Sequence, residues 1–124
     1  MEYTITVSND QKYIVIKIKG DINRHNAMPL NLEAYKIAKE QNIRKFFVDV
    51  TEARNTDDPI DSYEFAHKDM IQTAGIERGS RVAALVHPGD HSHDFMETVL
   101  HNAGGVFKLF HSIDQAMAFL LDDN

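Results

Sequence analysis

Two short segments near the start of the chain alternate apolar and polar residues, a pattern typical of strands that bury one face. Residues 4–8 read Thr-Ile-Thr-Val-Ser, and residues 13–19 read Tyr-Ile-Val-Ile-Lys-Ile-Lys. In the second segment the isoleucines share one face, whereas Lys17 and Lys19 lie on the other. The polar stretch SNDQK between the segments predicts a turn, so we expect an antiparallel hairpin that ends at Gly20.

After the hairpin, helical spacing alternates with short apolar runs. Apolar residues recur with helical periodicity over about residues 28–41, which predicts a helix. KFFVDV (residues 45–50) and RVAALV (residues 81–86) are apolar runs of the kind found in strands covered on both faces. VFKLF (residues 106–110) predicts a fifth strand, and the polar residues 51–61 predict a loop.

The helix after this loop has a clear start signal. Asp58 is a good capping residue, Pro59 suits the first helical position, and Asp61 places an acidic group in the first turn. The expected apolar stripe comprises Tyr63, Ala66, Met70, Ile71 and Ala74, and Gly75 would stop the helix.

Two more helices are expected towards the end of the chain. Asp90 or Ser92 would cap the first, and Ser112 with Gln115 three residues later forms a capping box for the second. Their apolar faces comprise Phe95, Met96, Val99, Leu100 and Ala103 in the first, and Ile113, Met117, Phe119, Leu120 and Leu121 in the second.

The resulting order of elements is β-β-α-β-α-β-α-β-α. Strands separated by helices become parallel neighbours through crossover connections, whereas the initial hairpin adds an antiparallel pair. The sequence therefore predicts an α/β fold in which four helices pack on a mixed five-stranded sheet. No internal repeat or linker divides the chain, so residues 1–124 are expected to form a single domain.

Composition excludes several classes of function. The net charge of −6 disfavours nucleic-acid binding, and the absence of cysteine excludes disulfides, thiolate metal sites and a cysteine nucleophile. No signal peptide is visible, and no apolar run reaches the roughly 20 residues of a membrane helix. We therefore expect a cytoplasmic protein with no membrane insertion.

The C-terminal block VFKLFHSIDQAMAFL, preceded by FFVDV and RVAALV in the same order of elements, carries a family resemblance. A strand ending in an aromatic residue leads into a short capped helix, with Phe110, Ala116 and Phe119 at the typical positions. Residues 13–121 thus resemble the SpoIIAA-like domains of the STAS (sulphate transporter and anti-sigma-factor antagonist) superfamily, although many members carry Trp where Phe119 stands. The resemblance implies a STAS-like fold.

The same resemblance implies a bacterial-type, non-enzymatic regulatory module. It would act through protein–protein interaction with a protein partner, by way of the helix after Pro59 and the preceding loop. Classical members carry an Asp-Ser-Ser-Gly motif whose serine is phosphorylated to prevent partner binding. The nearest match here is DSYE, with Asp61 and Ser62, and it lacks the second serine and the glycine. Ser62 is therefore either a regulatory phosphorylation site or an ordinary polar residue of the first helical turn.

The segment HPGDHSHD raises the question of a ligand site. Ligands of open α/β sheets gather beyond the carboxyl ends of the parallel strands. That edge is expected to hold Asp49 and Thr51 after the third strand, His87 after the fourth and His111 after the fifth. His91 and His93 lie in the same loop, so the candidate ligand rim comprises Asp49, Thr51, His87, His91, His93 and His111.

One interpretation of the segment is a metal site at this rim, with His87, His91 and His93 as the ligands. Their spacing matches no established metal motif. In the simpler interpretation, Pro88-Gly89 form a turn, Asp90 or Ser92 caps the following helix, and the histidines are solvated. We therefore expect no metal and no cofactor.

No catalytic residues are predicted, because the chain has no nucleophile elbow and no phosphate-binding loop. Asp49 is either a base or an ordinary polar strand end. The alternative to a regulatory module is a domain that binds or senses a small molecule, either lipid-like or anionic, with metal binding through the histidine loop as a third option. A homodimer is also expected, since two-fold dimers are the commonest assemblies.

Overall fold

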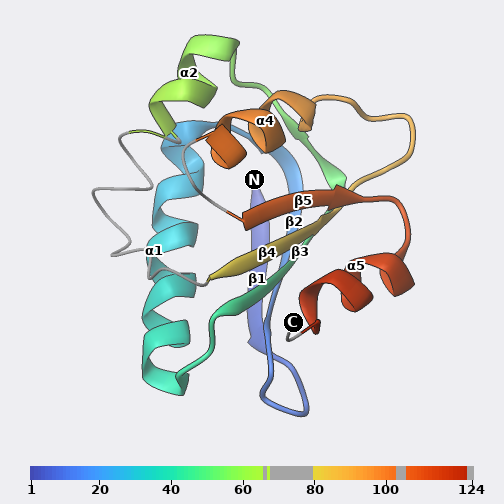
Figure 1. Ribbon diagram of the computed structural model, residues 1–124. Helices are drawn as coiled ribbons and strands as arrows, with labels where there is room; N and C mark the ends of the chain where they lie inside the picture. Colours follow the sequence, from blue (N-terminus) through green and yellow to red (C-terminus); the bar gives the residue numbers. More distant parts are fainter. Residues whose placement is uncertain (66, 68–79, 103–105, 123–124) are drawn as a thin grey trace.

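The computed structural model describes residues 1–65, 67, 80–102 and 106–122 (Figure 1). Within these residues the predicted order of five strands and four helices is confirmed. None of the described helices is long and apolar enough to cross a lipid bilayer. The elements are β1 (Glu2–Val7), β2 (Ile14–Ile22), α1 (Arg24–Gln41), β3 (Lys45–Asn55), α2 (Pro59–Glu64), β4 (Arg81–Leu85), α4 (Asp94–Asn102), β5 (Val106–Phe110) and α5 (Ile113–Leu120).

The strands form one mixed sheet whose spatial order equals their order in the chain, β1-β2-β3-β4-β5. β1 pairs antiparallel with β2, and every later pair is parallel. The register aligns a row of apolar residues across the sheet, from Ile5 through Ile16, Val48 and Ala84 to Leu109. Since parallel crossovers are right-handed, a sheet built in chain order receives its connecting helices on one face.

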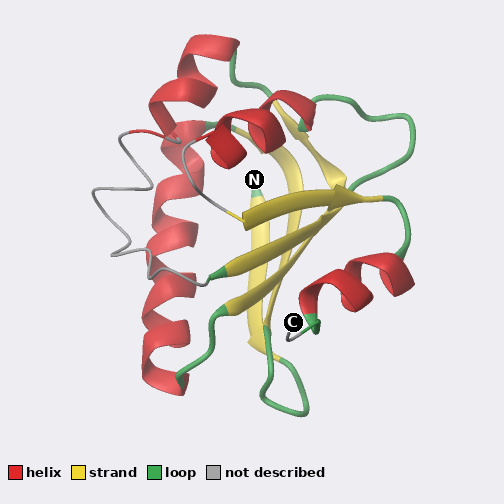
Figure 2. Ribbon diagram, viewed as in Figure 1, coloured by secondary structure: helices red, strands yellow, loops and turns green. Residues whose placement is uncertain are grey.

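The described helices that connect parallel strands lie on one face of the sheet, whereas α5, which follows the last strand, lies on the other (Figure 2). The face that carries α1 holds the larger core, in which Leu30 and Ala34 of the helix pack on isoleucines of β2. The opposite face carries α5, whose buried Ala116 and Leu120 pack with Phe47 and Leu85. Neighbouring residues of one strand therefore belong to different cores, as period-2 alternation requires.

β3 is longer than the sequence pattern predicts. Residues 51–55 were expected in a loop, but they continue the strand and pair with β2 as far as Ile22 and Asn55. β4 pairs with β3 only up to Asp49, so the continuation has a strand partner on one side only. This one-sided pairing explains why the polar sequence TEARN is compatible with a strand. β2 likewise runs past Gly20, which adopts a positive φ of 97° inside the strand.

The helix starts are only partly as predicted. α1 begins at Arg24 instead of residue 28, because Asn23 and Asn26 form a reciprocal capping box. The Asp58 cap is confirmed: its Oδ1 accepts a hydrogen bond from the Asp61 N–H at 2.7 Å. The predicted stripe residues Ala66, Met70, Ile71 and Ala74, and the stop at Gly75, lie outside the described residues.

The last two helices differ in how they begin. Ser112 caps α5 as predicted, accepting from the Gln115 N–H at 3.4 Å. The predicted cap of α4 by Asp90 or Ser92 is wrong, because the helix begins at Asp94 and both side chains bond elsewhere. Their hydrogen bonds fasten the preceding loop to β3, as described below.

Candidate functional site

The carboxyl ends of β4 and β5 border a shallow depression, here called the edge cleft. It brings together three residues of the predicted rim, Thr51, His87 and His111. Its remaining wall comprises Leu85, Val86, Pro88, Ser112, Ile113 and Asp114. The rule that placed the candidate residues at this edge of the sheet therefore predicted the position of half of them.

Asp49 was predicted at the end of the third strand and Thr51 just after it, but the strand does not end there. Both lie inside β3, because the strand continues to Asn55 along β2. The Oδ1 atom of Asp49 accepts from the Thr51 backbone N–H at 3.0 Å and from its hydroxyl at 2.7 Å. Asp49 thus orients Thr51 instead of lining the edge cleft itself.

The first half of the histidine loop forms a tight turn. The Asp90 N–H donates to the His87 carbonyl oxygen at 2.9 Å, as expected for a turn over Pro88 and Gly89. The Nδ1 atom of His87 accepts from the Gly89 N–H at 3.1 Å. This bond fixes the ring and places the proton of neutral imidazole on Nε2.

The second half of the loop fastens onto the end of β3 through residues 90–93, here called the loop clasp. The Ser92 hydroxyl accepts from the Asn55 N–H at 3.0 Å, while Asp90 Oδ1 accepts from the Ser92 N–H at 2.8 Å. Burial by itself raises the pKa of Asp90, but the hydrogen bonds from Ser92 and the nearby charges of His93 and Arg54 lower it overall.

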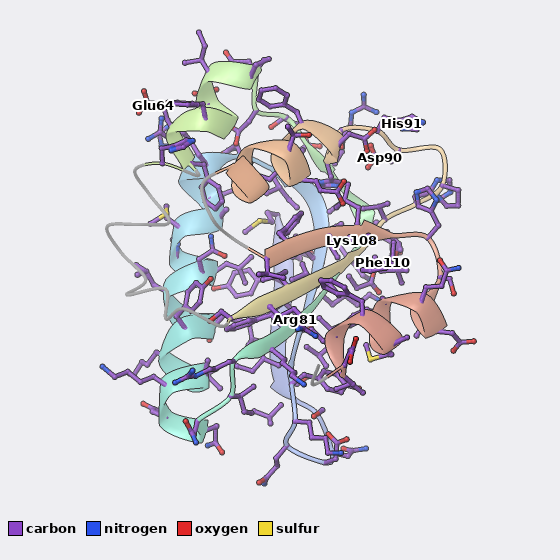
Figure 3. The ribbon with its side chains drawn as sticks, in the orientation of Figure 1. Glu64, Arg81, Asp90, His91, Lys108 and Phe110 are labelled. Atoms are coloured by element: carbon purple, nitrogen blue, oxygen red, sulfur yellow. The ribbon has the colours of Figure 1, made fainter. Side chains whose placement is uncertain are left out.

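His93 is buried in this clasp with only 7% of its surface exposed. Its Nε2 lies 3.2 Å from the Ala53 carbonyl oxygen and 3.4 Å from Asp90 Oδ2. His91 instead remains exposed, with its Nδ1 3.0 Å from Asp94 Oδ2, and it adjoins Asp90 in the loop before α4 (Figure 3). His91 and His93 thus lie outside the wall of the edge cleft, whose histidines are His87 and His111.

These positions bear on the metal hypothesis. In the described ranges no group of three or more histidine, aspartate or glutamate side chains is arranged to hold a metal ion. His93 donates its Nε2 proton to a carbonyl oxygen, so that nitrogen has no lone pair for a metal. The three histidines of HPGDHSHD therefore have different partners: the Gly89 N–H for His87, Asp94 for His91, and the Ala53 carbonyl oxygen for His93.

A second hollow lies between α1 and the sheet and is here called the α1 cavity. It has a volume of about 140 Å³. Tyr35 and Phe46 form part of its wall and pack edge-to-face with ring centroids 5.1 Å apart. Burial raises the pKa of Tyr35 to about 12. Further apolar lining residues are Ile16, Ile18, Ile22, Ala27, Leu30, Ala34, Val48, Val50, Phe65, Val82, Ala84, Met96, Phe107 and Leu109.

Polar residues of the cavity wall gather where β2 and β3 end and α1 and α4 begin. Asp57 Oδ1 accepts from the Arg24 N–H at 3.1 Å, and Asn55 Oδ1 accepts from the Asp57 N–H at 3.0 Å. Arg24 also forms an ion pair with Glu64 at 3.9 Å. Burial and the neighbouring Asp61 raise the pKa of Asp57 against the opposing effect of Arg24.

Comparison with known proteins identifies the fold. An anti-sigma factor antagonist from Mycobacterium paratuberculosis superposes with a TM-score of 0.61 at 12% sequence identity, over 98% of this chain and 96% of that one. An uncharacterized DUF3478-family protein from Shewanella loihica PV-4, described as having a SpoIIAA-like fold, gives 0.54 at 19% identity, over 96% and 92%. No protein family and no curated protein matches the sequence itself. The chain has a SpoIIAA-like fold.

The SpoIIAA-like domain also exposes apolar side chains on α2 and α4, two helices that pack against each other. Ile60 is 72% exposed, Tyr63 55% and Phe95 47%, and together they are called the α2–α4 patch. Tyr63 and Phe95 were predicted to belong to the apolar faces of their helices, and the structure leaves both side chains exposed. Phe95 and Met96 are consecutive helical residues, so only one of them, Met96, can face the sheet.

Proposed function

We propose that this SpoIIAA-like domain is a non-enzymatic regulatory module that binds a protein partner through the α2–α4 patch. The single observation that carries the proposal is the exposure of Ile60, Tyr63 and Phe95 on two adjacent helices. Exposed apolar side chains that gather on one surface of a small domain commonly mark interaction sites. A structural neighbour described as an anti-sigma factor antagonist supports the regulatory assignment.

Charge around the patch indicates the chemistry of the partner. Three acidic residues lie at the starts of the same two helices: Asp58 caps α2, and Asp61 and Asp94 lie in the first turns of α2 and α4. A complementary partner surface has an apolar centre surrounded by lysine and arginine, because opposite potentials steer association and select the partner. We therefore propose a partner with a basic rim, held mainly by burial of Ile60, Tyr63 and Phe95.

The test is affinity capture from the source cells with chemical crosslinking and a matched control. Ile60→Asp places a charge in the patch, and we expect it to reduce the amount of crosslinked partner at least tenfold. Leu32→Asp is the control, because Leu32 is 46% exposed on α1 and belongs neither to the patch nor to the wall of the edge cleft or the α1 cavity. Crosslinks that map to α2 or α4 and disappear only in Ile60→Asp support the proposal. Equal capture by both variants would contradict it.

Ser62 is proposed as the regulatory position, since it lies in α2 together with two patch residues. A phosphate on Ser62 would add negative charge to a short helix that already carries Asp61 and two patch residues, and like-charge repulsion and desolvation would oppose binding. We expect Ser62→Asp to reduce capture of the partner as Ile60→Asp does, and Ser62→Ala to retain it. Phosphopeptide mass spectrometry of protein from its own cells tests whether the modification occurs; an unmodified Ser62 under all growth conditions would refute the switch.

A second candidate function is the binding of a small molecule, and the α1 cavity is the observation that favours it.

A cytoplasmic location and a homodimer remain predictions. Sedimentation of the purified chain tests the dimer, and fractionation of source cells tests the location.

A further inference from the structure

We infer that the α1 cavity binds a small uncharged molecule made of one apolar ring and a single hydrogen-bonding head group. This inference does not depend on the proposed partner at the α2–α4 patch. From the sequence, a lipid-like or an anionic ligand was the expected small-molecule alternative, whereas the cavity favours a ligand that is smaller than a lipid and uncharged. Three properties of the cavity carry it: volume, wall and charge.

The volume of about 140 Å³ sets the size of the ligand. An apolar cavity of about 150 Å³ walled by Leu, Ile and Phe stays free of water and binds benzene. A single ring with a short substituent therefore fits the free space, whereas a membrane-lipid acyl chain is several times larger.

The wall favours a ring over a polar body. Much of it is apolar side chains: Ile16 and Ile18 from β2, Phe46 and Val48 from β3, and Leu30 and Tyr35 from α1. The edge-to-face pair of Tyr35 and Phe46 offers the geometry that a third aromatic ring prefers. Apolar surface of this kind gives water few partners, so an apolar ligand replaces little bound water.

The polar end determines the charge of the head group. Asp57 and Arg24 belong to the wall, and Glu64 outside the wall pairs with the guanidinium of Arg24, so the positive charge at this end already has a carboxylate partner. Burial raises the pKa of Asp57, in keeping with the poor solvation of a carboxylate at this end. A carboxylate or phosphate head would be repelled, whereas a hydroxyl can donate to Asp57 or accept from an asparagine amide of the wall.

Benzyl alcohol and benzoate are matched probes, because they share the ring and differ in the charge of the head. Titrations followed by methyl NMR of isotope-labelled protein should show benzyl alcohol shifting the isoleucine and leucine signals of the cavity wall. We expect benzoate to bind at least tenfold more weakly. Equal or tighter binding of benzoate would overturn the charge assignment, and shifts confined to residues of the edge cleft would overturn the site.

A cavity-filling variant tests the location independently. Ala34 is 2% exposed and lines the cavity, so Ala34→Leu should weaken benzyl alcohol binding at least tenfold. Ala118→Leu makes the same change at an exposed position of α5 and should leave binding unaltered. If Ala34→Leu does not fold, Ala84→Val fills the same space from β4. Unchanged affinity in a folded filling variant would refute the inference.

Discussion

The Nε2 atom of His93 donates a hydrogen bond to the Ala53 carbonyl oxygen at 3.2 Å, across forty residues of sequence. The bond joins the start of α4 to the unpartnered side of β3, beyond the point where β4 ends. Since Ser92 accepts from the Asn55 N–H in the same region, the loop supplies hydrogen bonds that a neighbouring strand would otherwise make. The loop clasp is therefore a structural substitute for a longer β4.

Removing the buried imidazole should destabilise the domain. His93→Ala leaves the Ala53 carbonyl oxygen without its partner and opens a hole, and we expect a loss of about 2–3 kcal/mol in the free energy of unfolding. His91→Ala is the control, because 75% of that side chain is exposed, and it should change the value by less than about 0.5 kcal/mol. Urea denaturation measures both; similar losses in the two variants would contradict the structural role of His93.

Asp90 and Asp57 should give opposite pH dependences of stability. The folded-state pKa of Asp90 is below its unfolded value of 3.8, so its stabilising contribution is present above that value and disappears as the pH falls through the folded pKa. The folded-state pKa of Asp57 is raised above 3.8, so its contribution is present below that value and disappears as the pH rises through the folded pKa.

The measurement is urea denaturation across the acidic range for wild type and the two asparagine variants. Relative to wild type, Asp90→Asn should become less destabilising as the pH falls below 3.8. Asp57→Asn should become less destabilising, or more stabilising, as the pH rises above 3.8. A difference from wild type that is constant with pH in either variant would refute the corresponding pKa shift.

Arg81 should stabilise the end of α5. Its Nη1 donates to the Phe119 carbonyl oxygen at 2.8 Å and to that of Asp122, and its guanidinium lies 5.3 Å from the centroid of the Phe119 ring. Cations near the last carbonyls of a helix interact favourably with them, so Arg81→Met should cost about 1.5 kcal/mol.

Lys108→Met is the matched control, because Lys108 is exposed and its Nζ lies 6.0 Å from the centroid of the same Phe119 ring and 5.7 Å from that of Phe110. Thermal unfolding should show at most about a third of the Arg81→Met effect. If the lysine variant loses as much stability, the ring contacts matter more than the helix carbonyls.

Local sequence signals predicted the sheet and the starts of two of the four described helices, because alternation and capping act over a few residues. Asp58 and Ser112 cap helices as expected. The end of β3 could not be predicted, since residues 51–55 are polar and their pairing depends on β2 lying alongside. The failure extends to His93, whose burial results from that same unexpected stretch of strand.

The candidate site was likewise predictable where it depends on local sequence and unpredictable where it depends on contacts between distant segments. The rule for parallel sheets placed His87 and His111 at one edge, where they share the edge cleft with Thr51. It could not separate them from His91 and His93, because their placement depends on hydrogen bonds between distant segments. Exposure of Tyr63 and Phe95 was missed for a related reason: an apolar residue at helical spacing does not reveal whether a neighbour covers it.

The alternation of the strands has a consequence for the α1 cavity. Ile16, Val48 and Ala84 face the side of α1, and the residues next to them in the chain, Val15, Phe47 and Ala83, face α5. Sliding one strand by a single residue would exchange cavity wall and α5 core along its whole length. The packing beneath α5 therefore fixes which residues line the α1 cavity, although it does not contact the cavity. Substitutions on the α5 face of the sheet are thus a way to change the shape of the cavity on the opposite face.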